Sequence, residues 1–320
     1  MRLKHLLLTV YMLAFAGAAF AQQYPVKPAR IICPFPPGQA TDILARLIAE
    51  QLSKSFGQQF IVENKAGAGG AIGTTAAAKE PPDGYTLVMA TSATFGINPS
   101  LYPKLSYDPL RDFTPVANLA LTPQTLVTSP KSGLGSVKDL VAKAKVEEVN
   151  YASSGNGSTS HLTAEMFKSA AGGKLTHIPY KGSSDAQLGV IGGDVPIMFD
   201  AVPGVLAQIK SGKLKGLGIA SSKRSPFLPD VPTIAEQGYP GFEAVGWIGV
   251  AAPANTPPPI LDKLNAAIRE SLTRPEIKER FATLAFAQVE DNSRAAFAAF
   301  IKAEIAKWAK VVKESGAKID

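Results

Sequence analysis

Short apolar segments alternate with amphipathic ones along most of this chain, and this alternation constrains its fold more than any other feature. Residues 29–33 have the composition of a buried strand, and residues 41–56 place apolar side chains on one face of a helix. The order of strand then helix recurs as far as residue 220, which predicts an α/β fold with helices on mainly parallel sheets. The further predicted strands are 59–63, 86–90, 124–128, 150–152, 175–178, 195–199 and 216–220, and the further helices include 137–145, 184–191, 202–210 and 294–315.

Residues 1–21 have the pattern of a secretory signal peptide. The side chains Arg2, Lys4 and His5 precede an apolar run, and Ala19-Phe20-Ala21 forms a small-x-small cleavage site. The run is too short and too rich in alanine and glycine for a membrane span. We therefore expect secretion of the chain and removal of the signal.

The mature chain carries a mild and scattered positive charge. Loss of Arg2 and Lys4 leaves 31 Lys and Arg against 26 Asp and Glu, a net charge of +5. No run of five basic residues is present, so we expect no nucleic-acid partner. The lone Cys33 lies in an apolar strand, which excludes a disulfide framework. Two separated histidines, His161 and His177, suit zinc poorly, and we expect no metal and no cofactor.

The segment Phe35–Asp42 lies between the first strand and the first helix. Pro36, Pro37 and Gly38 stiffen and expose the backbone where the helix N-terminus leaves N–H groups unpaired. Such a junction binds an anion without a charged side chain. We therefore predict an anion site here, in a protein that holds its ligand and does not transform it.

Three further junctions, residues 67–73, 153–161 and 180–184, have the same order of strand, Gly- or Ser-rich loop and helix start. Together the four indicate a cleft at the carboxyl ends of strands, where open α/β sheets bind ligands. In the segment 153–161, hydroxyls can bind a carboxylate, and glycines permit close approach of the backbone. The alternative is a capped helix start, in which Ser158 or Thr159 only satisfies backbone N–H groups.

Enzymatic functions have weaker support in the sequence. The glycines at 67, 69 and 73 depart from the dinucleotide motif because Ile72 takes its sixth position. No Gly-x-Ser-x-Gly elbow is present. The alternative function is a secreted hydrolase that uses His161, although a histidine that opens a helix more often serves as a cap. A partner-binding adaptor without a small ligand is a third alternative.

Several short segments together resemble one known family across essentially the whole mature chain. The resemblance is to the Bug family of periplasmic solute receptors, the extracytoplasmic components of tripartite tricarboxylate transporters, and none of the segments is specific alone. They are Tyr24-Pro25, Phe35-Pro36-Pro37-Gly38, Val62-Glu63-Asn64, Gly67-Ala68-Gly69-Gly70, Asp83-Gly84-Tyr85-Thr86 and His177-Ile178-Pro179-Tyr180-Lys181-Gly182.

This resemblance implies a hinged, two-domain binding protein of the type II, Venus-flytrap kind. The chain would cross between domains near residues 122–126 and 244–248, and the ligand cleft would lie between the domains. The implied domains are 22–124 plus 247–320 for the first and 125–246 for the second.

The resemblance also implies a small carboxylate ligand, either a di- or tricarboxylate, an amino acid or an aromatic acid. A monomeric receptor would deliver it to inner-membrane transporter subunits. The family commonly has a second glycine where this chain has Gln39, so the ligand of a relative does not transfer to this chain.

In the expected site, N–H groups of Gly38, Ala40 and Thr41 bind one carboxylate, and the 153–161 loop faces them. Phe35, Phe95 or Phe199 would flank an aromatic ligand, and the alternative is that each is simply a core residue. With no catalytic residue expected, the predicted ligand-binding residues are Phe35, Pro37, Gly38, Gln39, Ala40, Thr41, Asp42, Thr91, Ser92, Ser154, Gly155, Gly157, Ser158, Thr159, His161, Tyr180, Gly182 and Asp200.

Overall fold

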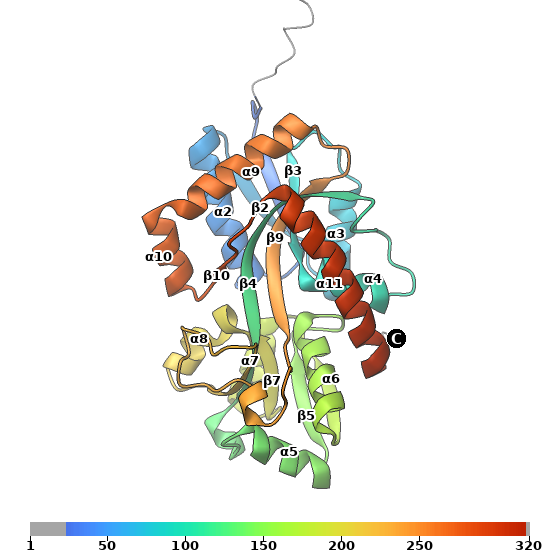
Figure 1. Ribbon diagram of the computed structural model, residues 1–320, viewed down its shortest axis with the longest axis vertical. Coiled ribbons are helices and arrows are strands. Elements are labelled where there is room, and N and C mark those ends of the chain that lie inside the picture. Colours follow the sequence, from blue (N-terminus) through green and yellow to red (C-terminus); the bar gives the residue numbers. More distant parts are fainter. Residues whose placement is uncertain (1–23, 318–320) are drawn as a thin grey trace, which may run out of the picture.

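Two lobes joined by a pair of long strands make up the protein (Figure 1). The computed structural model describes residues 24–317, so the predicted signal peptide lies outside the described residues. Strand β4 (Phe113–Thr128) runs from one lobe into the other, and β9 (Val245–Pro253) returns beside it. The predicted α/β, two-lobed binding-protein fold is confirmed.

The sheet of the first lobe has the strand order β2-β1-β3-β9-β4. Its members besides the crossover pair are β1 (Ala29–Cys33), β2 (Phe60–Asn64) and β3 (Thr86–Thr91). β1 is parallel to both β2 and β3, whereas β9 is antiparallel to β3 and to β4. A short strand, β10 (Ala287–Gln288), pairs with β4.

The sheet of the second lobe is built on the last part of β4. Its parallel strands are β5 (Val149–Ser153), β6 (Leu175–Pro179) and β7 (Ile197–Ala201), with β5 in the middle. Both β7 and β8 (Lys215–Ala220) are antiparallel to β4. The sheets are therefore mixed rather than mainly parallel, because a chain that crosses between lobes and returns has to run in both directions.

The crossover strands are longer than the sequence predicts. The predicted strand at 124–128 is only the end of β4, whose earlier part contains Pro115 and Pro123. Proline normally marks a strand boundary because it lacks an N–H group, and the register of β4 against β9 shifts beside Pro115. Because β4 continues without a break through residue 124, the domain limits stay a prediction.

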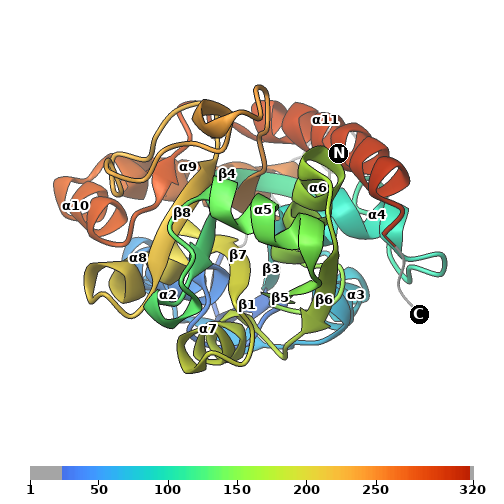
Figure 2. The same ribbon diagram turned by 90° about the horizontal axis from the view of Figure 1, so that it is seen from below.

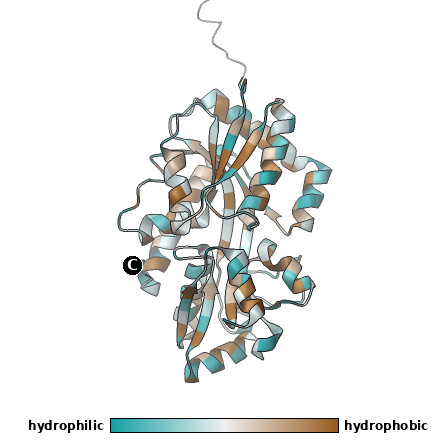
Figure 3. Ribbon diagram, turned by 180° about the vertical axis from the view of Figure 1, so that it is seen from behind, coloured by the Kyte–Doolittle hydropathy of each residue, from teal (hydrophilic) through white to brown (hydrophobic). Residues whose placement is uncertain are grey.

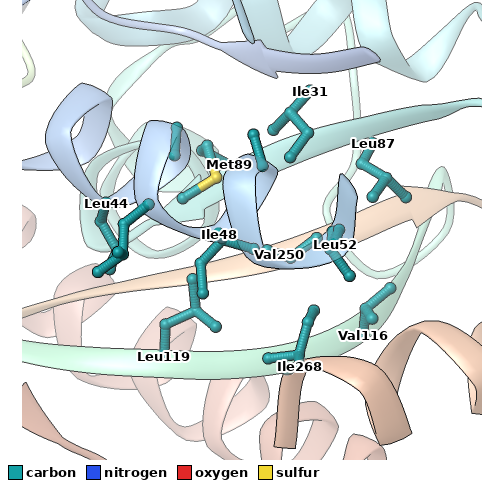
Figure 4. Close-up of a cluster of buried hydrophobic side chains, with 14 of the residues drawn as sticks. Ile31, Leu44, Ile48, Leu52, Leu87, Met89, Val116, Leu119, Val250 and Ile268 are labelled. Carbon is teal, nitrogen blue, oxygen red and sulfur yellow. The ribbon is translucent and has the colours of Figure 1, made fainter. Parts of the chain in front are cut away.

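Helix α2 (Ala40–Phe56) packs its apolar face on the first-lobe sheet. Figure 4 shows Ile48 and Leu52 of α2 directed into a cluster with Leu119 of β4 and Ile268 of α9 (Pro258–Thr273). Complete burial of such a side chain contributes about 1.5–3 kcal/mol. The remaining longer helices of this lobe are α3 (Ala71–Ala78) and α10 (Pro275–Thr283).

The helices of the second lobe follow their strands as the alternating pattern predicts. They are α5 (Val137–Val146), α6 (Thr159–Ala171), α7 (Ser183–Gly192) and α8 (Val202–Lys210). Figure 3 shows hydrophobic and hydrophilic residues alternating along these helices, as one-sided packing requires. No helix within residues 24–317 is long and apolar enough to cross a membrane.

The C-terminal helix α11 (Arg294–Ser315) starts in the first lobe and reaches α6 of the second (Figures 1 and 2). Its Trp308 packs in an apolar cluster with Leu162 of α6, which we call the interlobe cluster. Glu304 of α11, itself buried, accepts hydrogen bonds from the indole N–H groups of Trp308 and of Trp247 in β9, both at 2.9 Å. The other buried members of the interlobe cluster are Ile97, Leu101 and Val312.

Candidate functional site

A polar cavity of about 70 Å³ lies between the two lobes. A buried water needs roughly 10–15 Å³ of such space, so this cavity, which is partly open to solvent, suits a small ligand. The first lobe contributes the start of α2 and the short π-helix Ser92–Ile97 that follows β3. The second lobe contributes the loop before α6 and the end of β7, and the crossover strands contribute Gln124 and Trp247.

Asp42, in the first turn of α2, organises the loop that precedes the helix. Its carboxylate accepts hydrogen bonds from the Gly38 N–H and Arg46 Nε, both at 3.0 Å, and from Asn64 Nδ2 at 2.9 Å. Burial alone would raise the pKa of Asp42, but these bonds outweigh it and hold that pKa below its usual value. The expectation that the Gly38 N–H binds ligand is therefore wrong, because Asp42 already takes that donor. Asp42 supports the loop and does not line the cavity.

Gln39 is the N-cap residue of α2, but its side chain makes no capping hydrogen bond. The side chain lines the cavity and is 9% exposed, and its Nε2 is buried without a hydrogen-bond partner within the described chain. A Cβ atom at Gly182 would lie 2.6 Å from this Nε2, so Gln39 reaches the loop of the opposite lobe. A buried unpaired donor costs about 1–3 kcal/mol, so this amide remains available to an acceptor on a ligand.

A direct hydrogen bond links the two lobes at the edge of the cavity. Ser92 Oγ of the π-helix lies 2.9 Å from Thr159 Oγ1 at the start of α6. Thr91 precedes the π-helix and caps it, since its hydroxyl accepts from the Thr94 N–H at 3.2 Å. The lobes are therefore in contact, and the cleft is closed.

The loop before α6 is held by its own hydroxyls. Ser158 caps the helix by accepting from the His161 N–H at 3.2 Å, and Ser160 Oγ accepts from the Ser154 N–H at 3.0 Å. All three serines line the cavity. Both alternatives for this loop are therefore met at Ser158, which caps α6 and also faces the cavity.

His161 lies beneath this loop and not in the cavity wall. Its Nδ1 accepts a hydrogen bond from the Gly157 N–H at 3.3 Å, and its ring stacks on His177 with centroids 4.0 Å apart. Burial lowers the pKa of His161 to about 4 and that of His177 to about 3. His161 is thus a neutral support of the loop at physiological pH.

Asp200 lies at the end of β7 and is the buried carboxyl group of the cavity wall. Its Oδ1 accepts from the Ala201 N–H at 2.8 Å, and its Oδ2 accepts from Gln187 Nε2 at 2.8 Å and from the Ser183 hydroxyl. Burial raises the pKa of Asp200, against the hydrogen bonds from Ser183, Gln187 and Ala201, which lower it.

The structure brings many of the predicted site residues together, whereas their role in binding stays a prediction. Those that line the cavity are Phe35, Gln39, Ala40, Thr41, Thr91, Ser92, Ser154, Ser158, Thr159 and Asp200. Those that do not line it are Pro37, Gly38, Asp42, Gly155, Gly157, His161, Tyr180 and Gly182.

For two of the three phenylalanines the structure favours the core alternative, and several cavity residues were not predicted. Phe95 and Phe199 are fully buried in the cores of the first and second lobe. The polar residues Thr122 and Gln124 of β4 interrupt an apolar strand, which was the available signal for their role. The unpredicted lining residues are Ala93, Thr122, Gln124, Ser160, Ser183, Ala201, Trp247 and Ile248. No group of three potential metal ligands occurs within residues 24–317.

Two lobes that close on a polar cavity and are joined by crossover strands define a solute-binding receptor. The model of the tripartite tricarboxylate transporter family receptor matches residues 44–317. The chain belongs to this family, as its resemblance to Bug proteins predicts.

Similar proteins agree in sequence and in structure. The chain is 43% identical to the protein BugT of Bordetella pertussis over 310 residues, which is 95% of this chain and 94% of BugT. The structure of the periplasmic binding protein BugD has a TM-score of 0.87 at 36% identity and covers 92% of this chain and 99% of its own.

Two structures from Rhodopseudomonas palustris contain ligands. One, with adipate, has a TM-score of 0.89 at 35% identity and covers 92% of this chain and all of its own. The other, the protein MatC with bound malate, has a TM-score of 0.85 at 33% identity and covers 90% of this chain and all of its own.

Proposed function

We propose that this protein captures a small carboxylate outside the inner membrane and delivers it to a tripartite tricarboxylate transporter. The observation that carries this proposal is the cavity between the lobes, which is lined by Gln39, with its unpartnered amide, and by two helix N-termini from opposite lobes. Helix N-termini favour anions, because their first N–H groups have no partner within the helix.

The ligand carboxylate would lie at the start of α2, where Gln39, Ala40 and Thr41 line the cavity and the first-turn N–H groups have no partner within the helix. The loop before α6 would hold the ligand from the opposite lobe through Ser154, Ser158 and Thr159. Contacts to both lobes stabilise the closed state over the open one, so closure would be a hinge motion driven by differential binding. Adipate and malate in the two R. palustris relatives support a carboxylate ligand.

The place of action is the periplasm, with residues 1–21 as the export signal and the chain as a monomer. The family description and the periplasmic relative BugD support this location. We expect the docking partner to be the membrane subunits of the transporter.

Thermal unfolding of the refolded mature protein with mono-, di- and tricarboxylates tests the proposal. A ligand at 100 times its Kd adds about 2.7 kcal/mol to the free energy of unfolding, whereas the neutral amides of the same acids should add nothing. The absence of a shift across the whole series would contradict the receptor function and favour an adaptor.

The alternative function, a secreted hydrolase, predicts turnover that is lost in His161→Ala. We expect each bound acid to be recovered unchanged, because the Nδ1 of His161 is occupied by the Gly157 N–H and its ring lies outside the cavity wall. Product formation that disappears in His161→Ala would favour the hydrolase.

A further inference from the structure

The cavity wall has opposite hydrogen-bonding character at its two ends. Among the described residues that line it, Asp200 is the only one with a charged side chain, and no lysine or arginine contributes. The wall at the start of α2 presents donors, namely the Gln39 amide and first-turn N–H groups. A carboxylate placed there has partners without any cation.

The side chains around Asp200 offer mainly acceptors. The Ser183 hydroxyl donates its hydrogen to Asp200 Oδ2 and accepts a hydrogen bond from Gln187 Nε2 at 3.1 Å. One lone pair on Ser183 Oγ therefore remains free to accept a hydrogen bond. The two carboxyl oxygens of Asp200 accept about four hydrogen bonds in all. Three donors already bind them, so the carboxyl group is able to accept a further hydrogen bond. Gln124 donates through Nε2 to the carbonyl oxygen of Thr122 at 3.4 Å, so its Oε1 also remains an acceptor.

A second ligand carboxylate against these side chains would lie beside the carboxyl group of Asp200, which is 7% exposed, and like charges repel strongly where water is excluded. A hydroxyl or an ammonium group would instead supply the hydrogens that Asp200 and Ser183 can accept.

We propose that Asp200, together with Ser183, binds a hydrogen-bond donor on the ligand. The preferred ligands are then carboxylic acids that also carry a hydroxyl or ammonium group. This inference rests on the proposed function and assigns the ligand class of the same cavity.

Calorimetric titration of matched acids tests the inference. The probes are three skeletons, each unsubstituted, with a hydroxyl and with an amino group: propionate, lactate and alanine; succinate, malate and aspartate; benzoate, salicylate and 2-aminobenzoate. On the skeleton that binds best, we expect the hydroxy or the amino acid to bind at least fivefold tighter than the unsubstituted acid. A ratio below fivefold overturns the inference.

Asp200→Asn presents an amide donor and no charge to the ligand. We expect this variant to reduce the preference for the substituted acid at least threefold, mainly by improving binding of the unsubstituted one, and a smaller change overturns the inference. Ser183→Ala, which removes only the hydroxyl, gives the same test if Asp200→Asn does not fold. If no acid binds, the proposed function fails as well, whereas binding without preference contradicts this inference alone.

Discussion

At the scale of single residues, polar side chains of this protein either support the cavity or face it. Asp42 and His161 are support residues whose hydrogen bonds are used within their own loops. Gln39 is the opposite case, because its buried amide has no partner in the described chain and lies in the cavity wall. The sequence drew attention to all three, but only the geometry separates the two roles.

Replacement of Gln39 by alanine should weaken ligand binding about tenfold or more. A hydrogen bond to a charged group contributes about 1.5–3 kcal/mol, and this amide is free to make one. The free energy of unfolding of the unliganded protein should not fall, because no hydrogen bond of Nε2 is lost and a buried unpaired donor that costs about 1–3 kcal/mol is removed. Calorimetry and urea unfolding measure the two quantities, with the exposed Gln59→Ala as the control. Equal ligand affinity in Gln39→Ala and in the control would show that Gln39 does not bind the ligand.

His161 should make stability depend on pH. The pKa of His161 is about 4 in the folded protein, against an ordinary value of 6.5. Between these two pH values, the unfolded chain therefore binds the proton more readily than the folded chain. Its contribution is complete above pH 6.5 and is lost as the pH falls towards 4, by about 2 kcal/mol between pH 6.5 and 5.

Urea unfolding at several pH values measures this dependence. The variant His161→Gln keeps an acceptor for the Gly157 N–H but does not titrate, so its stability should fall less over the same range. The carboxyl groups of the protein are common to both chains and cancel in the comparison. An identical pH dependence in both proteins would show that folding does not lower the pKa of His161.

At the scale of elements, local patterns predicted the helices well and the crossover strands poorly. The apolar spacing of α11 predicted its limits, Arg294–Ser315, and that of α2 missed its start by one residue. Each of these patterns depends only on residues within its own helix, so the local sequence is enough to predict it. The first part of β4 was missed because Pro115 and Pro123 resemble boundaries, while its pairing with β9 joins segments far apart in the chain. Cavity residues on the missed parts of these strands, such as Thr122 and Trp247, were missed for the same reason.

The interlobe cluster should contribute to ligand affinity as well as to stability. Leu162 of α6 is fully buried against first-lobe residues such as Trp308, and opening of the cleft would separate them. Leu162→Ala should lower the free energy of unfolding by about 2–5 kcal/mol. Because the lost contacts exist only in the closed state, the variant should also shift the equilibrium towards the open state and so weaken ligand binding.

Leu140→Ala is the matched control, since Leu140 is equally buried but lies in the core of the second lobe alone. Thermal unfolding and calorimetry of both variants separate the two effects. We expect both to lose stability, with affinity at least tenfold weaker in Leu162→Ala and within about twofold of the wild type in Leu140→Ala. Similar ligand affinities in the two variants would mean that the interlobe cluster does not stabilise the closed state over the open one.

At the scale of the whole molecule, the two lobes are mechanically linked in three places. The crossover strands β4 and β9 join them covalently, Ser92 and Thr159 join them at the edge of the cavity, and α11 reaches across to α6. We propose that residues 22–124 with 247–320 and residues 125–246 move as the two rigid bodies. The predicted hinge lies within continuous strands, which bend without losing their hydrogen bonds to one another.

The two tryptophans of the chain share one hydrogen-bond acceptor, Glu304. Trp247 lines the cavity, so a bound ligand would change the surroundings of its indole. Trp308 belongs to the interlobe cluster, so movement of the lobes would change the surroundings of the other indole. The protein thus carries its own optical probe: intrinsic fluorescence should change on binding in intensity or in wavelength of maximum emission. Glu304→Gln, which keeps an acceptor oxygen without the charge, should alter the starting spectrum. A spectrum unaffected by a saturating acid would contradict this coupling, whereas a change would let binding rates be followed without a label.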